Sequence, residues 1–470
     1  MYKGIKSCVS VNNECSQLFF CNTGVRQGEN LSPVLFSLYL NDLENHLLNL
    51  NCTGVAPIIE AQDNFLELGI HLLCLLYADD TALLATNAND LQKTLNAFLE
   101  YCKKWKLKVN SDKTKVIIFN GNTNDYKKTF ILGDKPLENV KEYKYLGLTF
   151  TKQNKFKITK KDLTQRATKA IYFVLSKAKE HSLPLDCKLK LFDSMVLPIL
   201  LYGCEIWGYE NLDIIENIHI NFLRRLLPVK KSTPLFMLYG ELGRTPLKLI
   251  IDQRIIGFWA RIVKGKITKI SNLMLNYMIR DSSTNGHNYK WLEHVQHIFD
   301  NLGMSDIFRS NKFSSLKLLI QHVKQRQLDQ YMQIWNSNIE SASKGKTYII
   351  FKQTLNLENY FIKLPEKMWT ILLKFRTSNH YLPIEIGRWN NIPTENRICT
   401  LCESNDIGDE YHYLFKCNYF LNTRTQFLKP YYYNKPSTLK FKELFNCNNI
   451  STIRKISKFI AEIFSKFSKP

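Results

Sequence analysis

Apolar and polar residues follow one pattern along the first third of this chain and another along the rest. Up to about residue 155, short apolar runs at 71–77, 81–86, 115–119 and 143–150 have the length and composition of β-strands. Beyond that point, apolar residues recur every three or four positions within long basic segments, as they do in amphipathic helices. The pattern predicts a region of mixed strands and helices followed by a mostly helical one.

The first region also contains two predicted helices. Ser32 and Pro33, as N-cap and first helical residue, begin a helix that runs to about Asn49. Asn89 caps a second helix over 90–108. Its apolar residues share one face: Leu91, Leu95, Phe98, Leu99, Cys102 and Trp105. Turn-tolerant residues between two apolar runs predict a β-hairpin whose tip is Ala78-Asp79-Asp80.

The second region is predicted to be a series of helices. They lie near 160–182, 186–201, 212–227, 246–264, 288–301, 313–335 and 365–377. Polar segments at 279–289 and 337–347 are predicted linkers. The tail at 451–470 predicts a basic amphipathic helix, for which nucleic acid, a protein partner and a membrane surface all stay open as ligands.

The formal net charge of +22 is concentrated in the second region. Residues 1–150 carry 15 Lys and Arg against 16 Asp and Glu, whereas residues 151–470 carry 49 against 26. This distribution favours a polyanionic partner, nucleic acid above an acidic membrane. Arg224-Arg225 and Lys230-Lys231 flank a predicted helix end, where they either contact a nucleic-acid backbone or form a solvated face.

Other features of the sequence narrow the class of protein. No run of 18 apolar residues predicts a membrane span, and the first residues lack the apolar segment of a secretory signal. We therefore expect an intracellular protein, with nucleus and cytoplasm both open. Its twelve cysteines are then reduced thiols or metal ligands. The oligomeric state stays open.

The stretch LLYADDTALLA at 75–85 places two adjacent carboxylates between apolar runs. Such a pair is costly unless a cation neutralises it, and Mg²⁺ prefers carboxylate oxygens together with water and phosphate. An Asp-Asp dipeptide alone is more often an ordinary solvated turn. The sequence segments around this dipeptide instead favour a metal-binding role over a solvated turn.

Four segments occur in an order that resembles the palm of reverse transcriptases, specifically those of the non-long-terminal-repeat (non-LTR, LINE-type) retrotransposons. GVRQGENLSPVLFSLYLNDL at 24–43 resembles motif B, and LLYADDTALLA resembles motif C. LKVNSDKTKVIIF at 107–119 and YKYLGLTF at 143–150 resemble motifs D and E. Residues 160–230, including ILLYGCEIWG at 199–208, resemble the thumb that follows in these elements.

The resemblance implies roles for individual residues. Asp79 and Asp80 would coordinate catalytic Mg²⁺ or Mn²⁺, and Lys113 would lie near the triphosphate and help pyrophosphate leave. The incoming nucleotide and the template would lie against Arg26, Gln27, Gly28 and Tyr77. The primer end would be gripped by Tyr145, Leu146 and Gly147. The implied partners are an RNA template, a DNA primer and a deoxynucleoside triphosphate.

One expected carboxylate has no match in the sequence. In the family, motif A precedes motif B and supplies another metal-binding Asp, but the 23 residues before Gly24 contain only Glu14 as an acid. Two-metal phosphoryl transfer needs carboxylates from at least two places in a chain. We therefore expect the chain to begin within the palm, to be catalytically incomplete alone, and to expose one edge of the sheet that carries motif C.

A second candidate site is RICTLCESNDIGDEYHYLFKC at 397–417. Its potential ligands have the spacing C-x2-C-x9-H-x4-C: Cys399, Cys402, His412 and Cys417. Three thiolates and one imidazole suit tetrahedral Zn²⁺, against the alternative of reduced core cysteines. The resemblance agrees, because many elements of this class carry such a cluster near the C-terminus. The neighbouring Lys416 and Arg397 suit phosphate contacts.

The predicted fold is α+β. It comprises a partial right-hand polymerase palm at 1–152, a helical thumb-like region at 153–280, a helical basic region at 281–395, and a zinc-knuckle-like module with a basic C-terminal helix at 396–470. The predicted function is that of a non-LTR retrotransposon reverse transcriptase domain. The alternatives are a non-catalytic nucleic-acid-binding protein and a non-functional retroelement fragment.

Overall fold

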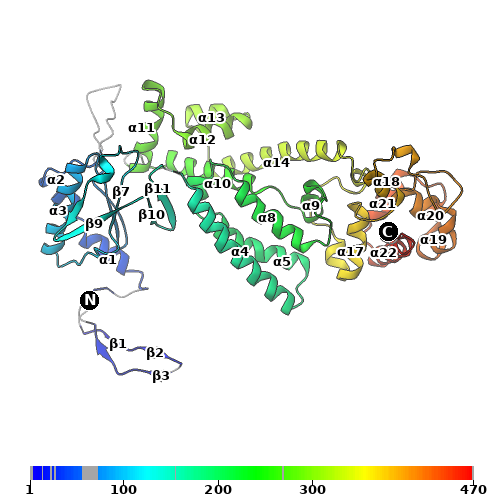
Figure 1. Ribbon diagram of the computed structural model, residues 1–470, viewed down its shortest axis with the longest axis horizontal. Helices are drawn as coiled ribbons and strands as arrows, with labels where there is room; N and C mark the ends of the chain where they lie inside the picture. Colours follow the sequence, from blue (N-terminus) through cyan, green and yellow to red (C-terminus); the bar gives the residue numbers. More distant parts are fainter. Residues whose placement is uncertain are drawn as a thin grey trace. The chain divides into compact units, whose positions relative to one another are not determined.

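The computed structural model describes residues 4–12, 14–21, 24–25, 28–55, 72–153, 155–266 and 269–467. The chain forms two compact units (Figure 1). The first comprises Met1–Phe156 with Ile279–Asp281, and the second comprises Lys157–Met278 with Ser282–Pro470. Small sheets and helices make up the first unit, and helices dominate the second, so the mixed composition agrees with the predicted α+β class. The finer division at residues 280 and 395 stays a prediction.

The strands of the first unit form several small sheets. Two antiparallel pairs near its start are β1 (Lys6–Ser7) with β4 (Phe19–Phe20) and β2 (Ser10–Val11) with β3 (Glu14–Cys15). A three-stranded sheet has β9 (Lys135–Val140) between β7 (Lys115–Ile117), which is parallel to it, and β8 (Phe130–Leu132), which is antiparallel. Two further hairpins are β5 (Cys74–Tyr77) with β6 (Asp80–Leu83) and β10 (Glu142–Tyr145) with β11 (Leu148–Thr151).

Helix α3 (Ala88–Lys104) organises the core of this unit. Its buried Tyr101 packs with Leu43 and Leu47 of α2 (Leu43–Asn49), while Leu95 packs with Val116 and the strands β8 and β9. The buried carboxylate of Asp90 accepts the backbone N–H groups of residues 53 and 54, which ties the segment after α2 to the start of α3. These contacts fix the scaffold on which the β5–β6 hairpin stands.

Two helix predictions in this unit need correction. The helix predicted over 32–49 is interrupted, because α1 ends at Tyr39 (Ser32–Tyr39) and α2 begins at Leu43. In the interruption, Asp42 accepts a hydrogen bond from the Tyr101 hydroxyl, a contact 59 residues away that local sequence does not reveal. The cap of α3 is Asn87 and not Asn89: its side chain accepts the N–H of Asp90 at 2.9 Å.

The second unit is an assembly of helices with short connections. Their bounds are α4 Lys157–Glu180, α5 Leu185–Leu191, α6 Leu197–Leu200, α7 Cys204–Trp207, α8 Asp213–Leu226, α9 Leu235–Leu242, α10 Leu247–Val263, α11 Ile270–Thr284, α12 Lys290–Asn301, α13 Ser305–Ser310, α14 Leu316–Glu340, α15 Tyr348–Phe351, α16 Tyr360–Lys363, α17 Glu366–Arg376, α18 Pro383–Trp389, α19 Leu421–Phe427, α20 Pro430–Tyr433, α21 Thr438–Phe445 and α22 Ile450–Ser465. A π-helical segment, Phe192–Val196, joins α5 to α6, and another spans His412–Lys416.

Most helices predicted in this region are confirmed, with corrections at the predicted linkers and the tail. Both predicted linkers begin inside helices, since α11 extends to Thr284 and α14 to Glu340. The tail helix α22 packs on α17 and buries its apolar face, including Phe459 and Ile460. That face is therefore part of the core of the unit. Among the helices of the described part of the chain, none is long and apolar enough to cross a membrane.

Candidate functional site

The β5–β6 hairpin presents the two adjacent aspartates in solvent. Tyr77 pairs with Asp80, so Ala78 and Asp79 form a two-residue turn. Ala78 has φ of +50°, in the left-handed region that costs a residue with a Cβ roughly 1–2 kcal/mol. Both aspartates and Tyr77 are exposed. The turn thus holds two carboxylates where a hard cation can reach them, as the sequence predicted.

The segment 143–150 is not the single strand that its apolar pattern predicts. It is the β10–β11 hairpin, with Leu146 and Gly147 as the two central turn residues. Their φ angles, +47° and +83°, are both positive, as a type I′ turn requires. Gly147 adopts this conformation without strain, whereas Leu146 has a Cβ and lies 37% exposed at the tip.

Three of the predicted site segments lie close together in the first unit. Burial, and next the negative charge of Asp80, raises the pKa of Tyr145, which places Tyr145 near that carboxylate. Two residues earlier on the same strand, the Tyr143 hydroxyl donates to the backbone carbonyl of Lys113 at 3.5 Å. Lys113 itself is exposed in a turn after Asn110. The segments that resemble motifs C, D and E therefore meet at this edge of the unit.

Of the remaining residues predicted to contact the nucleotide and template, the structure describes Gly28 but not Arg26 or Gln27. Gly28 is exposed in a turn before α1, with φ of +88°. Arg26 and Gln27 lie outside the described residues. Within those residues, β5 and β6 pair only with each other, and no third acid, Cys or His joins Asp79 and Asp80 in a group able to share one ion.

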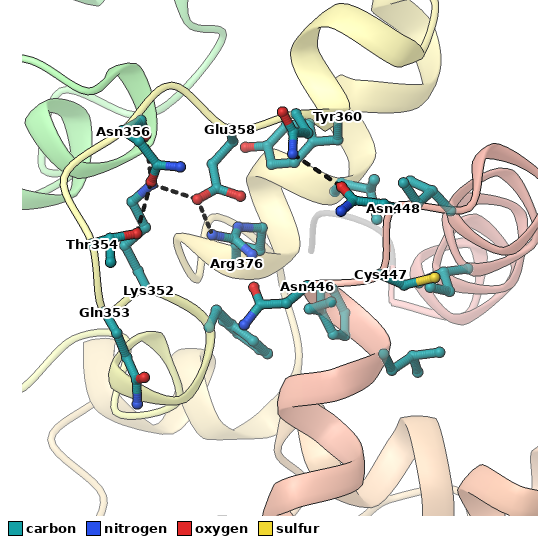
Figure 2. A pocket seen from close by; sticks show the side chains of 17 residues that line it. Lys352, Gln353, Thr354, Asn356, Glu358, Tyr360, Arg376, Asn446, Cys447 and Asn448 are labelled. Atoms are coloured by element: carbon teal, nitrogen blue, oxygen red, sulfur yellow. Dashed lines mark hydrogen bonds and ion pairs between the residues drawn. The ribbon is translucent and has the colours of Figure 1, made fainter.

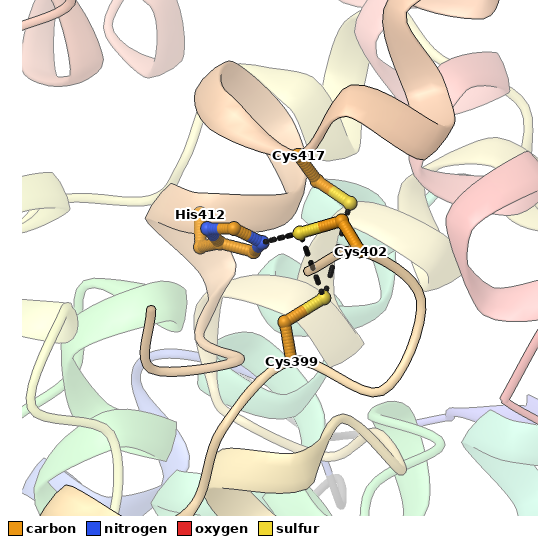
Figure 3. A group of neighbouring side chains, drawn as sticks. All are labelled: Cys399, Cys402, His412 and Cys417. Atoms are coloured by element: carbon orange, nitrogen blue, oxygen red, sulfur yellow. Dashed lines mark hydrogen bonds between the residues drawn. The ribbon is translucent and has the colours of Figure 1, made fainter. Parts of the chain in front are cut away.

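The four predicted ligands of the second candidate site do converge (Figure 3). Their ligand atoms all lie within 4.8 Å of one another. The Cys399 sulfur is 3.6 Å from that of Cys402 and 3.9 Å from that of Cys417, and the Cys402 sulfur is 3.4 Å from Nε2 of His412. Sulfur atoms that each lie 2.3 Å from a tetrahedral ion are about 3.8 Å apart. The cluster therefore has the dimensions of a Cys₃His metal site.

Local structure positions each ligand of this Cys₃His cluster. Cys399 and Cys402 lie on a tight loop whose ends are joined by an antiparallel bridge between Ile398 and Ile407. The N–H of Leu401 donates to the Cys399 sulfur at 3.4 Å. His412 lies in a short helix capped by the Asp409 carboxylate, which accepts the His412 N–H at 2.7 Å.

A second layer of contacts holds the histidine and the last cysteine. Nδ1 of His412 lies 3.4 Å from the Asp406 carboxylate, the kind of partner that orients a metal-binding imidazole. The buried Arg424 donates to the carbonyls of Leu414 and Cys417 at 2.9 and 2.8 Å. Arg397 donates to two backbone carbonyls, which commits its guanidinium to the fold, whereas Lys416 keeps an ammonium half exposed near Asp406.

The surroundings of the cluster favour the neutral form of His412 and shift the pKa values of its thiols in different directions. Burial lowers the pKa of His412, although Asp406 and Asp409 oppose the shift. Burial raises the pKa of the Cys417 thiol to about 12. For Cys402, burial also acts to raise the pKa, but hydrogen bonds involving Ser404 outweigh it and leave the pKa lowered. A bound metal ion would deprotonate all three thiols, since a coordinating thiol loses its proton.

A polar cavity of 270 Å³ in the second unit was not predicted from the sequence (Figure 2). Its wall contains a buried charge network in which Arg376 pairs with Glu241 and Glu358, and Lys352 pairs with Glu358. Arg376 and Glu241 are fully buried and 135 residues apart in sequence. An Arg inside an apolar helical pattern was the one available signal, and it does not identify the partner.

Comparisons with known proteins support the predicted resemblance over part of the chain. Residues 2–150 match the family model for reverse transcriptase (RNA-dependent DNA polymerase). The RNA-directed DNA polymerase from mobile element jockey of Drosophila funebris is 30% identical over 237 residues, which cover 48% of this chain and 23% of that protein. Its counterpart in Drosophila melanogaster is 27% identical, covering 46% of this chain and 22% of that protein.

A relative from another element agrees with this result. The Pol polyprotein from type-1 retrotransposable element R2 of Popillia japonica is 25% identical, covering 43% of this chain and 31% of that protein. The chain thus spans about a quarter to a third of the length of these relatives. The resemblance to non-LTR retrotransposon reverse transcriptases is confirmed, with the family-model match confined to the segment that carries motifs B to E.

Proposed function

We propose that this chain takes part in RNA-templated DNA synthesis, as the part of a non-LTR retrotransposon reverse transcriptase that carries motifs B to E. The observation that carries the proposal is the convergence of Asp80, Tyr145 and the Lys113 turn within the matched segment. The substrates would be an RNA template, a DNA primer and a deoxynucleoside triphosphate.

In this proposal each exposed group has one task. Asp79 and Asp80 would hold Mg²⁺ or Mn²⁺, which when bound stabilises negative charge on the reacting phosphates. Tyr145, Leu146 and Gly147 would position the primer end beside Asp80, and the Lys113 ammonium would offset charge on the departing pyrophosphate. Arg26, Gln27, Gly28 and Tyr77 would contact the nucleotide and template. A further carboxylate has to complete the metal site.

Primer extension on an RNA template tests this proposal. In a longer chain that supplies the missing carboxylate, we expect Mg²⁺-dependent extension that falls at least about 100-fold in Asp79→Asn, because a lost metal ligand removes several kcal/mol of transition-state stabilisation. The chain alone should extend no primer. Asp134→Asn is the matched control, since Asp134 is also an exposed turn aspartate of the first unit. Equal extension by wild type and Asp79→Asn would contradict the assigned role.

A second candidate function is nucleic-acid binding without catalysis. The observation that favours it is that, within the part of the chain described, no third ligand accompanies Asp79 and Asp80. Residues 151–470, with 49 Lys and Arg against 26 Asp and Glu, would then supply the binding. Tight binding of a primer–template by a chain that extends no primer even when the missing carboxylate is supplied would select this function. A chain without a cooperative unfolding transition would instead be a non-functional fragment.

We further propose that the Cys₃His cluster binds one Zn²⁺ that stabilises the C-terminal part of the chain. The sulfur separations, the oriented imidazole and the tight Cys399–Cys402 loop support it. Elemental analysis of the purified chain should find one zinc per chain, reduced at least tenfold in Cys402→Ser. Cys447→Ser, which removes a thiol outside the cluster, should keep its zinc. Equal zinc in the two variants would contradict the assignment.

A further inference from the structure

Four cationic side chains meet around Asn379 in the second unit. The side-chain oxygen Oδ1 of Asn379 accepts hydrogen bonds from the backbone N–H of Lys230 at 3.3 Å, the Thr233 hydroxyl at 3.0 Å and the Lys344 ammonium at 3.2 Å. Arg224, at the end of α8, donates to the Thr233 carbonyl at 3.1 Å. Segments that are far apart in the sequence thus build one site, called here the Asn379 cluster: Arg224, Lys230, Thr233, Lys344, Asn379, Tyr381, Glu385, Arg388 and Trp389.

The Asn379 cluster carries an excess of positive charge. Lys344 interacts electrostatically with three other cations, Arg224, Lys230 and Arg388, and with one acid, Glu385. That acid is buried and already pairs with Arg388 at 2.8 Å. Burial, with the neighbouring cations, lowers the pKa of Lys344 to about 8. An anion that binds among these four cations would be stabilised by their charges.

One donor in the cluster lacks an acceptor. Nη1 of Arg224 is buried and has no hydrogen-bond partner among the residues that the structure describes, while Nη2 is satisfied by Thr233. A buried donor on a cation is rarely left unpaired, because it loses its hydration and gains nothing in return. The guanidinium therefore offers a ready bond to an incoming oxygen.

Two aromatic rings contact Lys230, one of the cations of the cluster. The Lys230 ammonium lies 3.8 Å from the ring centre of Trp389 and 4.4 Å from that of Tyr381. Trp389 is 38% exposed, so the ammonium is confined at a surface that a ligand can reach. A cation beside an exposed aromatic ring is the combination that single-stranded nucleic acids use, phosphate on one and base on the other.

We propose that the Asn379 cluster binds a backbone phosphate of a single-stranded nucleic acid, with Lys230, Arg224 and Arg388 contacting its oxygens and Trp389 next to the adjacent base. The inference rests on the proposed function in assuming a nucleic-acid partner. It adds a specific contact formed by three segments that the sequence separates: 224–233, 344 and 379–389. A free phosphate ion offers the same oxygens and is the alternative source.

Lys230→Gln and its neighbour Lys231→Gln form a matched pair of variants. Both remove one positive charge, but Lys231 is exposed and outside the cluster, and the Lys230 backbone bond to Asn379 is kept in either variant. Affinity for a fluorescent 15-nucleotide single-stranded RNA is measured by anisotropy between 50 and 300 mM salt. The plot of log K against log salt has a negative slope, and one lost phosphate contact reduces its magnitude by about 0.7.

We expect Lys230→Gln to weaken binding about five- to tenfold and to reduce the magnitude of the slope by about 0.7, and Lys231→Gln to change affinity less than twofold. Equal effects of the two variants would overturn the proposal. Competition by millimolar inorganic phosphate against the 15-mer in wild type, with the oligonucleotide affinity of Lys230→Gln unchanged, would assign the cluster to free phosphate and also overturn it. Thermal unfolding of both variants verifies that they are folded.

Failure of this inference is distinguishable from failure of the proposed function. If primer extension depends on Asp79 while the two lysine variants bind RNA equally, only the cluster assignment is wrong. If wild type shows no salt-dependent RNA binding at all, both the nucleic-acid function and the cluster assignment are wrong.

Discussion

Replacing Arg376 by methionine tests whether the charge network beside the cavity stabilises the second unit. The guanidinium Nε lies 3.1 Å from both carboxylate oxygens of Glu241, and Nη2 lies 2.9 Å from one of them and 3.3 Å from Glu358. The Tyr360 hydroxyl also donates to Glu241, and Lys352 pairs with Glu358. Two cations thus balance two anions, and Arg376→Met leaves one negative charge uncompensated beside the fully buried Glu241.

We expect this single substitution to lower the free energy of unfolding by about 3–5 kcal/mol, the usual cost of removing one partner of a buried ion pair. The double variant Arg376→Met/Glu241→Gln should lose less, because it removes both charges and keeps an acceptor for Tyr360. As a control, Arg166→Met breaks an exposed pair with Asp162 at 3.6 Å and should cost at most about 0.5 kcal/mol.

Urea unfolding followed by tryptophan fluorescence measures these differences, since the buried Trp369 lies on the same helix as Arg376. With an m-value of about 3 kcal/mol/M, a loss of 4 kcal/mol moves the midpoint by about 1.3 M. A midpoint for Arg376→Met within 0.3 M of wild type, or a double variant less stable than the single one, would refute the reasoning.

The pH dependence of the free energy of unfolding is a second measurement, and the direction of its expected change is defined. Burial acts to raise the pKa of Glu241, but the charges of Arg376 and Lys352 outweigh it and leave the pKa lowered. A lowered folded-state pKa contributes stability above the unfolded value of 4.5, and this contribution is lost as pH falls through the folded value. Without Arg376, burial dominates and raises the pKa of Glu241, so stability should instead increase as pH falls from 7 towards 5.

Three further predictions concern the cap, the turn and the cationic site. Asn87→Ala should cost about 1 kcal/mol of unfolding free energy and Asn89→Ala much less, because only Asn87 accepts a backbone N–H of α3; urea midpoints compare them. Leu146→Asn should raise the thermal midpoint of the first unit, since Asn adopts positive φ more readily, yet reduce primer extension if Leu146 contacts the primer. RNA affinity should fall several-fold from pH 7 to pH 9 as Lys344, with a pKa of about 8, loses its charge, and Lys344→Met should abolish that dependence by the same anisotropy assay.

Hairpins show how far local sequence predicts this fold. The β5–β6 hairpin was predicted because polar, turn-tolerant residues separate two apolar runs. The β10–β11 hairpin was missed because its turn begins with Leu146, an apolar residue that does not favour positive φ. Gly147 was the one local signal, and a Gly inside a strand indicates a bulge as readily as a turn.

For the Cys₃His cluster, the sequence identified the four candidate ligands but not the residues that support them. The spacing of Cys399, Cys402, His412 and Cys417 identified a set that the structure brings together. Asp406, which lies near the imidazole, and Arg424, which donates to the Cys417 carbonyl, have no distinguishing pattern, since their partners are set by tertiary structure. The network of Glu241 with Arg376 was missed for the same reason. In the Asn379 cluster, Arg224 and Lys230 were singled out from the sequence, but Lys344 and Asn379, which join them only on folding, were not.

The net charge of residues 151–470 overstates the charge available to a polyanion. Several of its cations are committed to the interior, among them Lys160, which contacts Glu210, Arg376, which pairs with Glu241, and Arg424, which donates to carbonyls. Such groups contribute to the composition but present little charge to a ligand. What matters is where cations gather locally beside exposed groups, as Lys230 does on Trp389. We therefore expect the local charge balance to be a better guide to a nucleic-acid contact than the sum over the sequence. Lys230 and Lys231 test this expectation, because they contribute equally to the sum and differ in their surroundings.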